Sequence, residues 1–180
     1  MTDATPTATL RALVERATGE HLDDAPGTTV GGRGDSPGPA ERLRPLLAGT
    51  RSVVAVVPRL DPSIVAAVRG RNGGSRVGDS GTVGHDDGAD ARIVCVGQAR
   101  DRVTGPAGAA LRAVAREEGI RLSVADGNSR VGFLLADDSA VAVGLFDGAG
   151  LAALVTSDAP AVRSWVAATC SRYATAAESL

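Results

Sequence analysis

The sequence contains no lysine, since all 19 basic residues among its 180 are arginine. Arginine keeps a permanent charge but does not serve as an amine nucleophile. A Schiff base needs a lysine amine, and a Walker A loop needs a lysine on the phosphates of its nucleotide. The absence of lysine therefore excludes P-loop nucleotide hydrolases and lysine-based covalent enzymes.

Aromatic residues, cysteines and long apolar runs are also scarce. Aromatics make up 2% of the chain, too few for a base-stacking surface, and two cysteines are too few for a disulfide scaffold or a zinc site. The 19 basic and 21 acidic residues nearly balance, so no basic field for nucleic acid is expected. No apolar run approaches the roughly 20 residues that cross a bilayer, and the first residues lack a signal-peptide pattern. These features predict a cytoplasmic protein with no membrane contact and no direct binding of nucleic acid.

The segment 1–39 is expected to lie outside the folded domain. Apolar residues recur at helical spacing from Leu10 to Ala17, and Gly19 suits the end of that short helix. Residues 20–39 then lose all periodicity and are rich in glycine and proline. Such a segment buries little apolar surface, so the composition predicts a flexible linker with a loosely attached helix before it.

Residues 40–180 show the alternation of a single α/β domain. Continuous apolar, β-branched runs at 52–57, 92–96 and 120–124 are typical of buried parallel strands, and helical patterns separate them. The glycine-rich stretch at about 70–90 has no apolar periodicity. A structureless loop of this length is uncommon in a compact domain, so we interpret it as a disordered insertion or a functional lid.

The last third of the chain changes to short strands and one long helix. Apolar residues at 131–136, 141–145 and 151–155 are joined by short turns, one of them at Asp147-Gly148, which forces an antiparallel meander. The closing helix carries a core stripe of Val162, Trp165, Val166, Thr169, Cys170 and Tyr173. The predicted fold class is α/β, a mixed sheet with flanking helices, an antiparallel meander and a closing C-terminal helix.

Candidate metal ligands gather in the glycine-rich insertion, but their order fits no known metal loop. They are Asp79, His85, Asp86, Asp87 and Asp90. They lack helical spacing and the order of a calcium loop, which favours a charged insertion over a weak divalent-ion site. His21 and His85 lie in loops, where no rigid neighbour is expected to fix the imidazole tautomer. Both cysteines fall on apolar faces, where a reactive thiol is not expected. No metal, no cofactor and no catalytic residue is predicted.

One polar cluster ranks higher as a ligand site. Asp126, Asn128 and Arg130 join the α/β half to the meander, where a crevice is expected, although turn formation also explains them. The carboxylates Asp126, Asp137, Asp138 and Asp147 all lie at strand ends and leave a hydrolytic pair open as an alternative. The segment 105–108, Gly-Pro-Ala-Gly, marks a helix start rather than a phosphate cradle, because no Gly-x-Gly-x-x-Gly precedes it.

Hydrophobic patterns over residues 40–180 resemble a known family. They comprise the runs 119–126, 131–138, 141–147 and 152–158, the residues Trp165 and Tyr173, and upstream the run 48–62. Together they look like the sensor domain of the TrmB-like transcriptional regulators of haloarchaea. The resemblance implies a phospholipase-D-like fold without the phospholipase motif, and the lack of lysine agrees, since no His-x-Lys motif can be written. The family couples this domain to a winged helix and senses small effectors, sugars in its best-known members.

The resemblance and the residues together favour one function and leave others open. Residues 1–39 offer a short helix and a linker in place of a winged helix, and the insertion at 70–90 replaces a usual stretch of the family. We therefore expect a non-catalytic domain that binds a sugar or metabolite effector, or that pairs with a second copy or with a DNA-binding partner. A degenerate or unfamiliar enzyme that uses strand-end carboxylates or the His85 loop is the alternative, and a remnant with little independent function is a third possibility.

Overall fold

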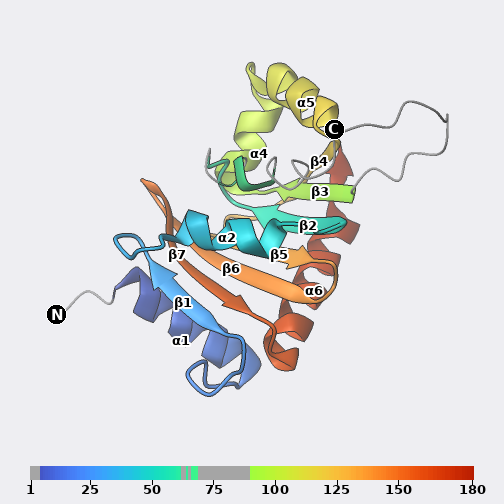
Figure 1. Ribbon diagram of the computed structural model, residues 1–180. Helices are drawn as coiled ribbons and strands as arrows, with labels where there is room; N and C mark the ends of the chain where they lie inside the picture. The colour runs from blue at the N-terminus through green and yellow to red at the C-terminus, as the bar shows by residue number, and fades with distance from the viewer. Residues whose placement is uncertain (1–4, 62–63, 65, 69–89) are drawn as a thin grey trace, which may run out of the picture.

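The computed structural model describes residues 5–61, 64, 66–68 and 90–180, and within them eight strands form one mixed sheet. Across the sheet the strand order is β1-β7-β6-β5-β2-β3-β4-β8 (Figure 1). The strands are β1 (Thr29–Gly32), β2 (Ser52–Val57), β3 (Asp90–Cys95), β4 (Ile120–Val124), β5 (Val131–Ala136), β6 (Ala140–Asp147), β7 (Gly150–Ser157) and β8 (Glu178–Ser179). The helices described in full are α1 (Pro6–Thr18), α2 (Pro39–Leu47), α4 (Gly97–Thr104), α5 (Gly108–Glu117) and α6 (Pro160–Ala176).

The sheet combines a parallel half with an antiparallel half, as the sequence predicted. Strands β2, β3 and β4 run parallel, and β5, β6 and β7 form an antiparallel meander. The two halves meet where β5 pairs antiparallel with β2. Parallel strands need cover on both faces, which explains why the apolar runs of β2 and β3 are continuous rather than alternating.

Helices cover both faces of this sheet and make a three-layer α/β fold. One buried cluster joins the sheet to α2, to α4 and to the helical residues Ile64, Ala67 and Val68. The other cluster joins the opposite face of the sheet to α1 and α6. The helices α2 and α6 therefore lie on opposite faces (Figure 1). The α/β fold class expected from the sequence, with its closing C-terminal helix, is confirmed.

Residues 20–39 are not the flexible linker that their composition predicted. They contain β1, which pairs antiparallel with β7, and Leu22 and Ala25 are buried beside α1 in the second cluster. The expected short helix is present as α1, which Thr5 caps by accepting the N–H of Ala8 at 3.2 Å. It ends at Gly19, whose φ of 75° is left-handed. The composition misled because the partner strand of β1 lies more than 120 residues further along the chain.

Glycine in this segment serves close packing rather than flexibility. A Cβ atom built on Gly32 would lie 2.5 Å from Oγ1 of Thr7 in α1. One built on Gly31 would lie 2.5 Å from Nε of Arg42 in α2. The side chains of Thr7 and Arg42 thus pack directly against the strand at positions where glycine leaves them room. Residues 70–89 of the expected insertion lie outside the described part of the chain.

Two local features differ from the sequence prediction. Helix α4 begins directly after β3, where no helix was expected, because its apolar face consists only of Ala99 and Val103. The β6–β7 hairpin forms at the predicted place, but its left-handed residue is Gly150, with φ of 111°, rather than the Asp147-Gly148 pair. Two consecutive residues with positive φ occur instead in the preceding turn, between β5 and β6, at Asp137 (46°) and Asp138 (54°).

Candidate functional site

The carboxyl ends of the three parallel strands meet at one edge of the sheet. After β4 the chain crosses back over this edge, past β3 and β2, to begin β5 on the far side of β2. We call residues 125–130 the crossover loop. The N–H of Gly97, which begins α4, donates to the carbonyl of Gly127 at 3.0 Å and ties the loop to the end of β3. A reversal of strand order of this kind leaves a crevice outside the strand ends, where α/β proteins bind ligands.

A cavity of about 240 Å³ occupies this position. It is lined by residues from the end of β2, the start of α4, the crossover loop and the β6–β7 hairpin. They are Pro58, Arg59, Gln98, Asn128, Ser129, Arg130, Phe146, Asp147 and Gly148. We call it the strand-end pocket. Four segments that lie far apart in the sequence build its wall, so the pocket exists only in the folded chain.

The structure places two of the three predicted site residues in the strand-end pocket. Asn128 and Arg130 line it, whereas the carboxylate of Asp126 forms an ion pair with Arg100 of α4 and is not part of the lining. Sequence reasoning missed Arg59 and Gln98. A signal was available, because each residue closely follows a predicted parallel strand, and the carboxyl ends of parallel strands share an edge.

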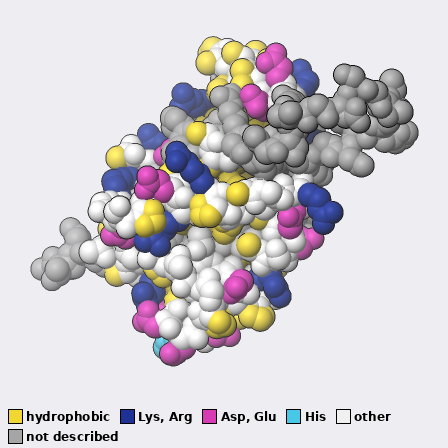
Figure 2. Space-filling model, in the orientation of Figure 1, with side chains coloured by type: hydrophobic (Ala, Val, Ile, Leu, Met, Phe, Trp, Pro, Cys, Tyr) yellow, Lys and Arg dark blue, Asp and Glu magenta, His cyan; other side chains and the backbone are white. Residues whose placement is uncertain are grey.

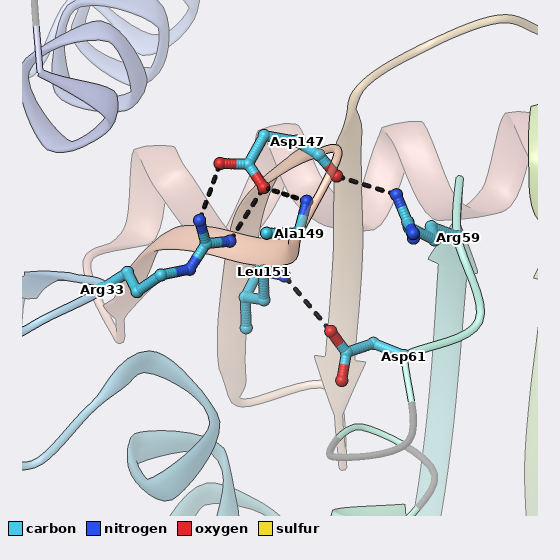
Figure 3. A network of polar contacts seen from close by, with 6 residues as sticks. All are labelled: Arg33, Arg59, Asp61, Asp147, Ala149 and Leu151. Carbon is cyan, nitrogen blue, oxygen red and sulfur yellow. Dashed lines mark hydrogen bonds and ion pairs between the residues drawn. The ribbon is translucent and has the colours of Figure 1, made fainter.

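Among the described residues that line the pocket, Asp147 is the one with a carboxylate, and Figure 3 shows its partners. Its two oxygens accept from the guanidinium of Arg33 at 2.9 and 2.8 Å, and one also accepts the N–H of Ala149 at 2.8 Å. Mainly because of Arg33, the pKa of Asp147 falls to about 2. Arg59 donates through Nη1 to the carbonyl of Asp147 at 3.0 Å, and Asp61 accepts the N–H of Leu151 at 3.2 Å. The network joins β1, the end of β2 and the hairpin.

Replacing Asp147 by asparagine is expected to remove part of the acid sensitivity of stability. A carboxylate with a depressed pKa stabilises the fold above its ordinary pKa, near 3.8, and loses that contribution as the pH falls through about 2. The gap in urea midpoint between wild type and Asp147→Asn should therefore be largest at pH 6 and shrink towards pH 2. Asp138→Asn, at the opposite end of β5, is the charge-matched control. A gap of equal size at both pH values would contradict the assignment.

The other chemical candidates from the sequence do not converge on the pocket. Asp137 lies at the far end of β5 and accepts the N–H groups of Arg51 and Ser52, which lowers its pKa. Six residues of strand, roughly 20 Å, separate it from the crossover loop. Burial raises the pKa of Cys95 and Cys170 to about 12, which keeps both thiols protonated. Within the described ranges no group of three His, Cys, Asp or Glu residues is placed to hold a metal ion.

Only one of the five candidate metal ligands in the glycine-rich insertion lies among the described residues. Asp79, His85, Asp86 and Asp87 lie outside the described residues, and Asp90 is the first residue of β3. Residues 105–107 form the turn between α4 and α5, and Gly108 begins α5, so the segment 105–108 is not a cradle after a strand. Arginine and acidic side chains are interspersed over the face drawn in Figure 2, without a patch of one sign in its described part.

A second cavity, of about 570 Å³, lies between α1, β5 and α6. Its residues are mostly apolar or small: Thr9, Ala12, Leu13, Arg16, Ala17, Ser129, Val131, Phe133 and Trp165. The rings of Phe133 and Trp165 meet edge to face, with centroids 5.3 Å apart. Ser129 of the crossover loop lines both cavities, so one loop forms the wall between the strand-end pocket and this groove.

Comparison with known proteins gives a family and a fold. The family model described as methanogenesis regulatory protein FilR1, middle domain, matches residues 84–176. No curated protein matches the chain significantly. Among solved structures, NucT from Helicobacter pylori is similar with a TM-score of 0.63 at 9% identity, over 85% of this chain and 98% of that one. Nuc from Salmonella typhimurium, a phospholipase D family member, is similar with a TM-score of 0.59 at 16% identity, over 85% and 97%.

A third similar structure is that of a chromatin protein. TrmBL2, described as an archaeal chromatin protein with a novel mode of DNA binding, is similar with a TM-score of 0.52 at 15% identity. The match covers 96% of this chain but 61% of TrmBL2. At these identities the three structures show a phospholipase-D-like fold, and a shared fold does not by itself imply a shared function. None of the described helices is long and apolar enough to cross a membrane.

Proposed function

The chain belongs to the family of the middle domain of the methanogenesis regulatory protein FilR1, and on that premise we propose that it is a non-catalytic, effector-sensing domain of a transcription regulator. A small molecule, a sugar or another metabolite, binds in the strand-end pocket. The observation that carries the proposal is the meeting of Asn128 and Arg130 with Arg59 and Gln98 around one cavity at the reversal of strand order.

The construction of the pocket suits a sensor. Its wall draws on the end of β2, the start of α4, the crossover loop and the β6–β7 hairpin, and Asp147 connects that hairpin to Arg33 beyond β1. A ligand that bridges these segments stabilises the arrangement in which they lie together. By mass action, binding to the folded state alone raises its stability in proportion to the logarithm of ligand concentration.

The absence of lysine and the positions of the carboxylates support a role without catalysis. A His-x-Lys motif cannot form in a chain that has no lysine. A hydrolytic carboxylate pair would need two acids at one place, but Asp126 pairs with Arg100, Asp147 pairs with Arg33, and Asp137 lies at the other end of β5. Each acid has a structural partner, and the three occupy separate places.

DNA binding is proposed to come from another domain or from a partner chain. TrmBL2 is described as binding DNA, and the part of TrmBL2 that this chain does not cover amounts to more than a third of its length. The described residues ahead of α2 form α1 and β1 rather than a winged helix. β1 is a strand of the sheet, and α1 packs against one of its faces. The haloarchaeal origin that the family resemblance implies and the cytoplasmic location stay predictions.

A thermal-shift screen against sugars, phosphorylated sugars and nucleotides tests the proposed function. We expect one compound class to raise the melting temperature saturably, and the shift to fall strongly in Arg130→Gln. Arg116→Gln, an exposed arginine on α5, is the matched control and should keep the full shift. A cooperative melt that no compound moves would contradict effector sensing. It would favour the second candidate, protein pairing, which the apolar groove with Trp165 supports.

A further inference from the structure

We propose that the strand-end pocket selects a small molecule through an anionic group, a phosphate or a carboxylate, held between Arg59 and Arg130. The inference rests on the proposed effector-sensing function and adds the chemical class of the ligand. It starts from the charges of the described lining, which holds two arginines and one carboxylate. That carboxylate, Asp147, is already paired with a third arginine, Arg33.

The two arginines of the pocket keep donors available for a ligand. Arg59 is half-buried and uses Nη1 for the carbonyl of Asp147, while a guanidinium carries five N–H donors in all. Arg130 is exposed at the start of β5, and its guanidinium has no hydrogen bond or ion pair with any described residue. The planar fork of arginine matches phosphate and carboxylate oxygens in pairs.

The acids of the crossover loop and of the described pocket lining are turned to other partners, and a third acid, Asp61, accepts the N–H of Leu151. Asp126, the only acid of the crossover loop, points to Arg100, and the carboxylate oxygens of Asp147 accept from Arg33 and from the N–H of Ala149. Without such partners these carboxylates would neutralise the pocket arginines. With them, the cavity keeps an excess of positive charge that an anion balances.

Uncharged hydrogen-bond donors of the pocket also favour a ligand rich in oxygen atoms. Gln98 stands in the first turn of α4, a helix with no acidic residue in that turn and no side-chain cap. The N–H groups of Gly97 and Ala99 in this turn already donate to the carbonyls of Gly127 and Pro58, so the charge of the pocket comes from its arginines. Amide groups of Gln98 and Asn128 supply further donors for oxygen. A volume of about 240 Å³ lies below the roughly 300 Å³ at which drug-sized sites begin, which suits a small metabolite.

Calorimetric titration of the full chain tests whether the anionic group of a ligand, rather than the rest of the ligand, provides the binding energy. The probes are inorganic phosphate, citrate, glucose 6-phosphate and glucose, each at an ionic strength matched with sodium chloride. We expect phosphate or citrate to bind saturably, and glucose 6-phosphate to bind at least tenfold more tightly than glucose if the source is a sugar phosphate. Each hydrogen bond to a charged group contributes about tenfold or more to the affinity. Arg130→Gln should therefore lower the affinity for the anion by at least that factor. Arg116→Gln should bind like wild type.

Each other outcome decides against the proposal in a distinct way. If glucose binds as tightly as glucose 6-phosphate, and Arg130→Gln leaves both affinities unchanged, selection through an anionic group is contradicted. Effector sensing would be left intact. An equal loss of binding in Arg116→Gln and Arg130→Gln would show general screening of surface charge and overturn the site. Phosphate and citrate that give no heat beyond that of sodium chloride would overturn the inference, and the sugar and nucleotide screen would then decide the proposed function separately. Melting curves of both variants verify that they are folded.

Discussion

Truncation of Leu10 to alanine is expected to lower the free energy of unfolding by about 2–5 kcal/mol. Leu10 lies on α1, its side chain is fully buried, and it belongs to the same cluster as Val143 and Val155 of the central meander. Removing three carbon atoms there forfeits their transfer free energy and leaves a cavity that the sheet cannot collapse to fill.

Equilibrium urea unfolding of wild type and Leu10→Ala measures the effect. Val114→Ala is the matched control, because Val114 is 40% exposed on α5, and the change should stay within about 0.5 kcal/mol. If α1 were a loosely attached helix on a linker, Leu10→Ala would resemble this control. A loss within the range expected for a buried leucine identifies α1 as part of the cooperative fold.

A methyl group added at Gly108 is expected to destabilise the fold by about 1–3 kcal/mol. Gly108 is the buried first residue of α5, and a Cβ atom there would lie 2.0 Å from the carbonyl oxygen of Val103 in α4. The same oxygen accepts from Nη1 of Arg112 at 2.5 Å, a bond that closes the end of α4. Because the clash is with backbone, α4 and α5 must move apart, and this cost exceeds the gain in helix propensity from alanine.

The comparison of Gly108→Ala with Gly148→Ala isolates the clash. A Cβ atom on Gly148 meets no atom within 4 Å and its φ is not positive, so that variant should stay within about 0.5 kcal/mol of wild type. Urea midpoints of the two variants provide the measurement. A Gly108→Ala variant as stable as wild type would mean that the end of α4 and the start of α5 do not meet this closely.

Local sequence determined the elements whose apolar residues repeat within a few positions. The continuous run at 52–57 is β2, the run at 120–124 is β4, and the alternating run at 131–136 is β5, each within the predicted bounds. Helix α6 and the meander follow from the same kind of signal. In these elements the side chains that pack together are neighbours in sequence or across short turns, so a pattern in the sequence is also a pattern in space.

Part of the site could be predicted in the same way. The polar cluster between β4 and β5 indicated a crevice, and Asn128 and Arg130 line the strand-end pocket. Their pocket partners Arg59 and Gln98 lie 69 and 30 positions before Asn128. The strand order alone brings these segments together, and no sequence period encodes strand order.

The sequence by itself thus determined the α/β class, the meander and, through the absence of lysine, that no lysine-dependent motif can be written in it. Only the tertiary structure decided that the glycines of β1 are close-packing positions, that Asp126 turns to Arg100, and that Arg33 holds Asp147. The physical reason is the same in each case: these contacts join segments separated by 11 to more than 100 residues. Their free energy comes from burial and charge pairing that exist once the sheet is assembled.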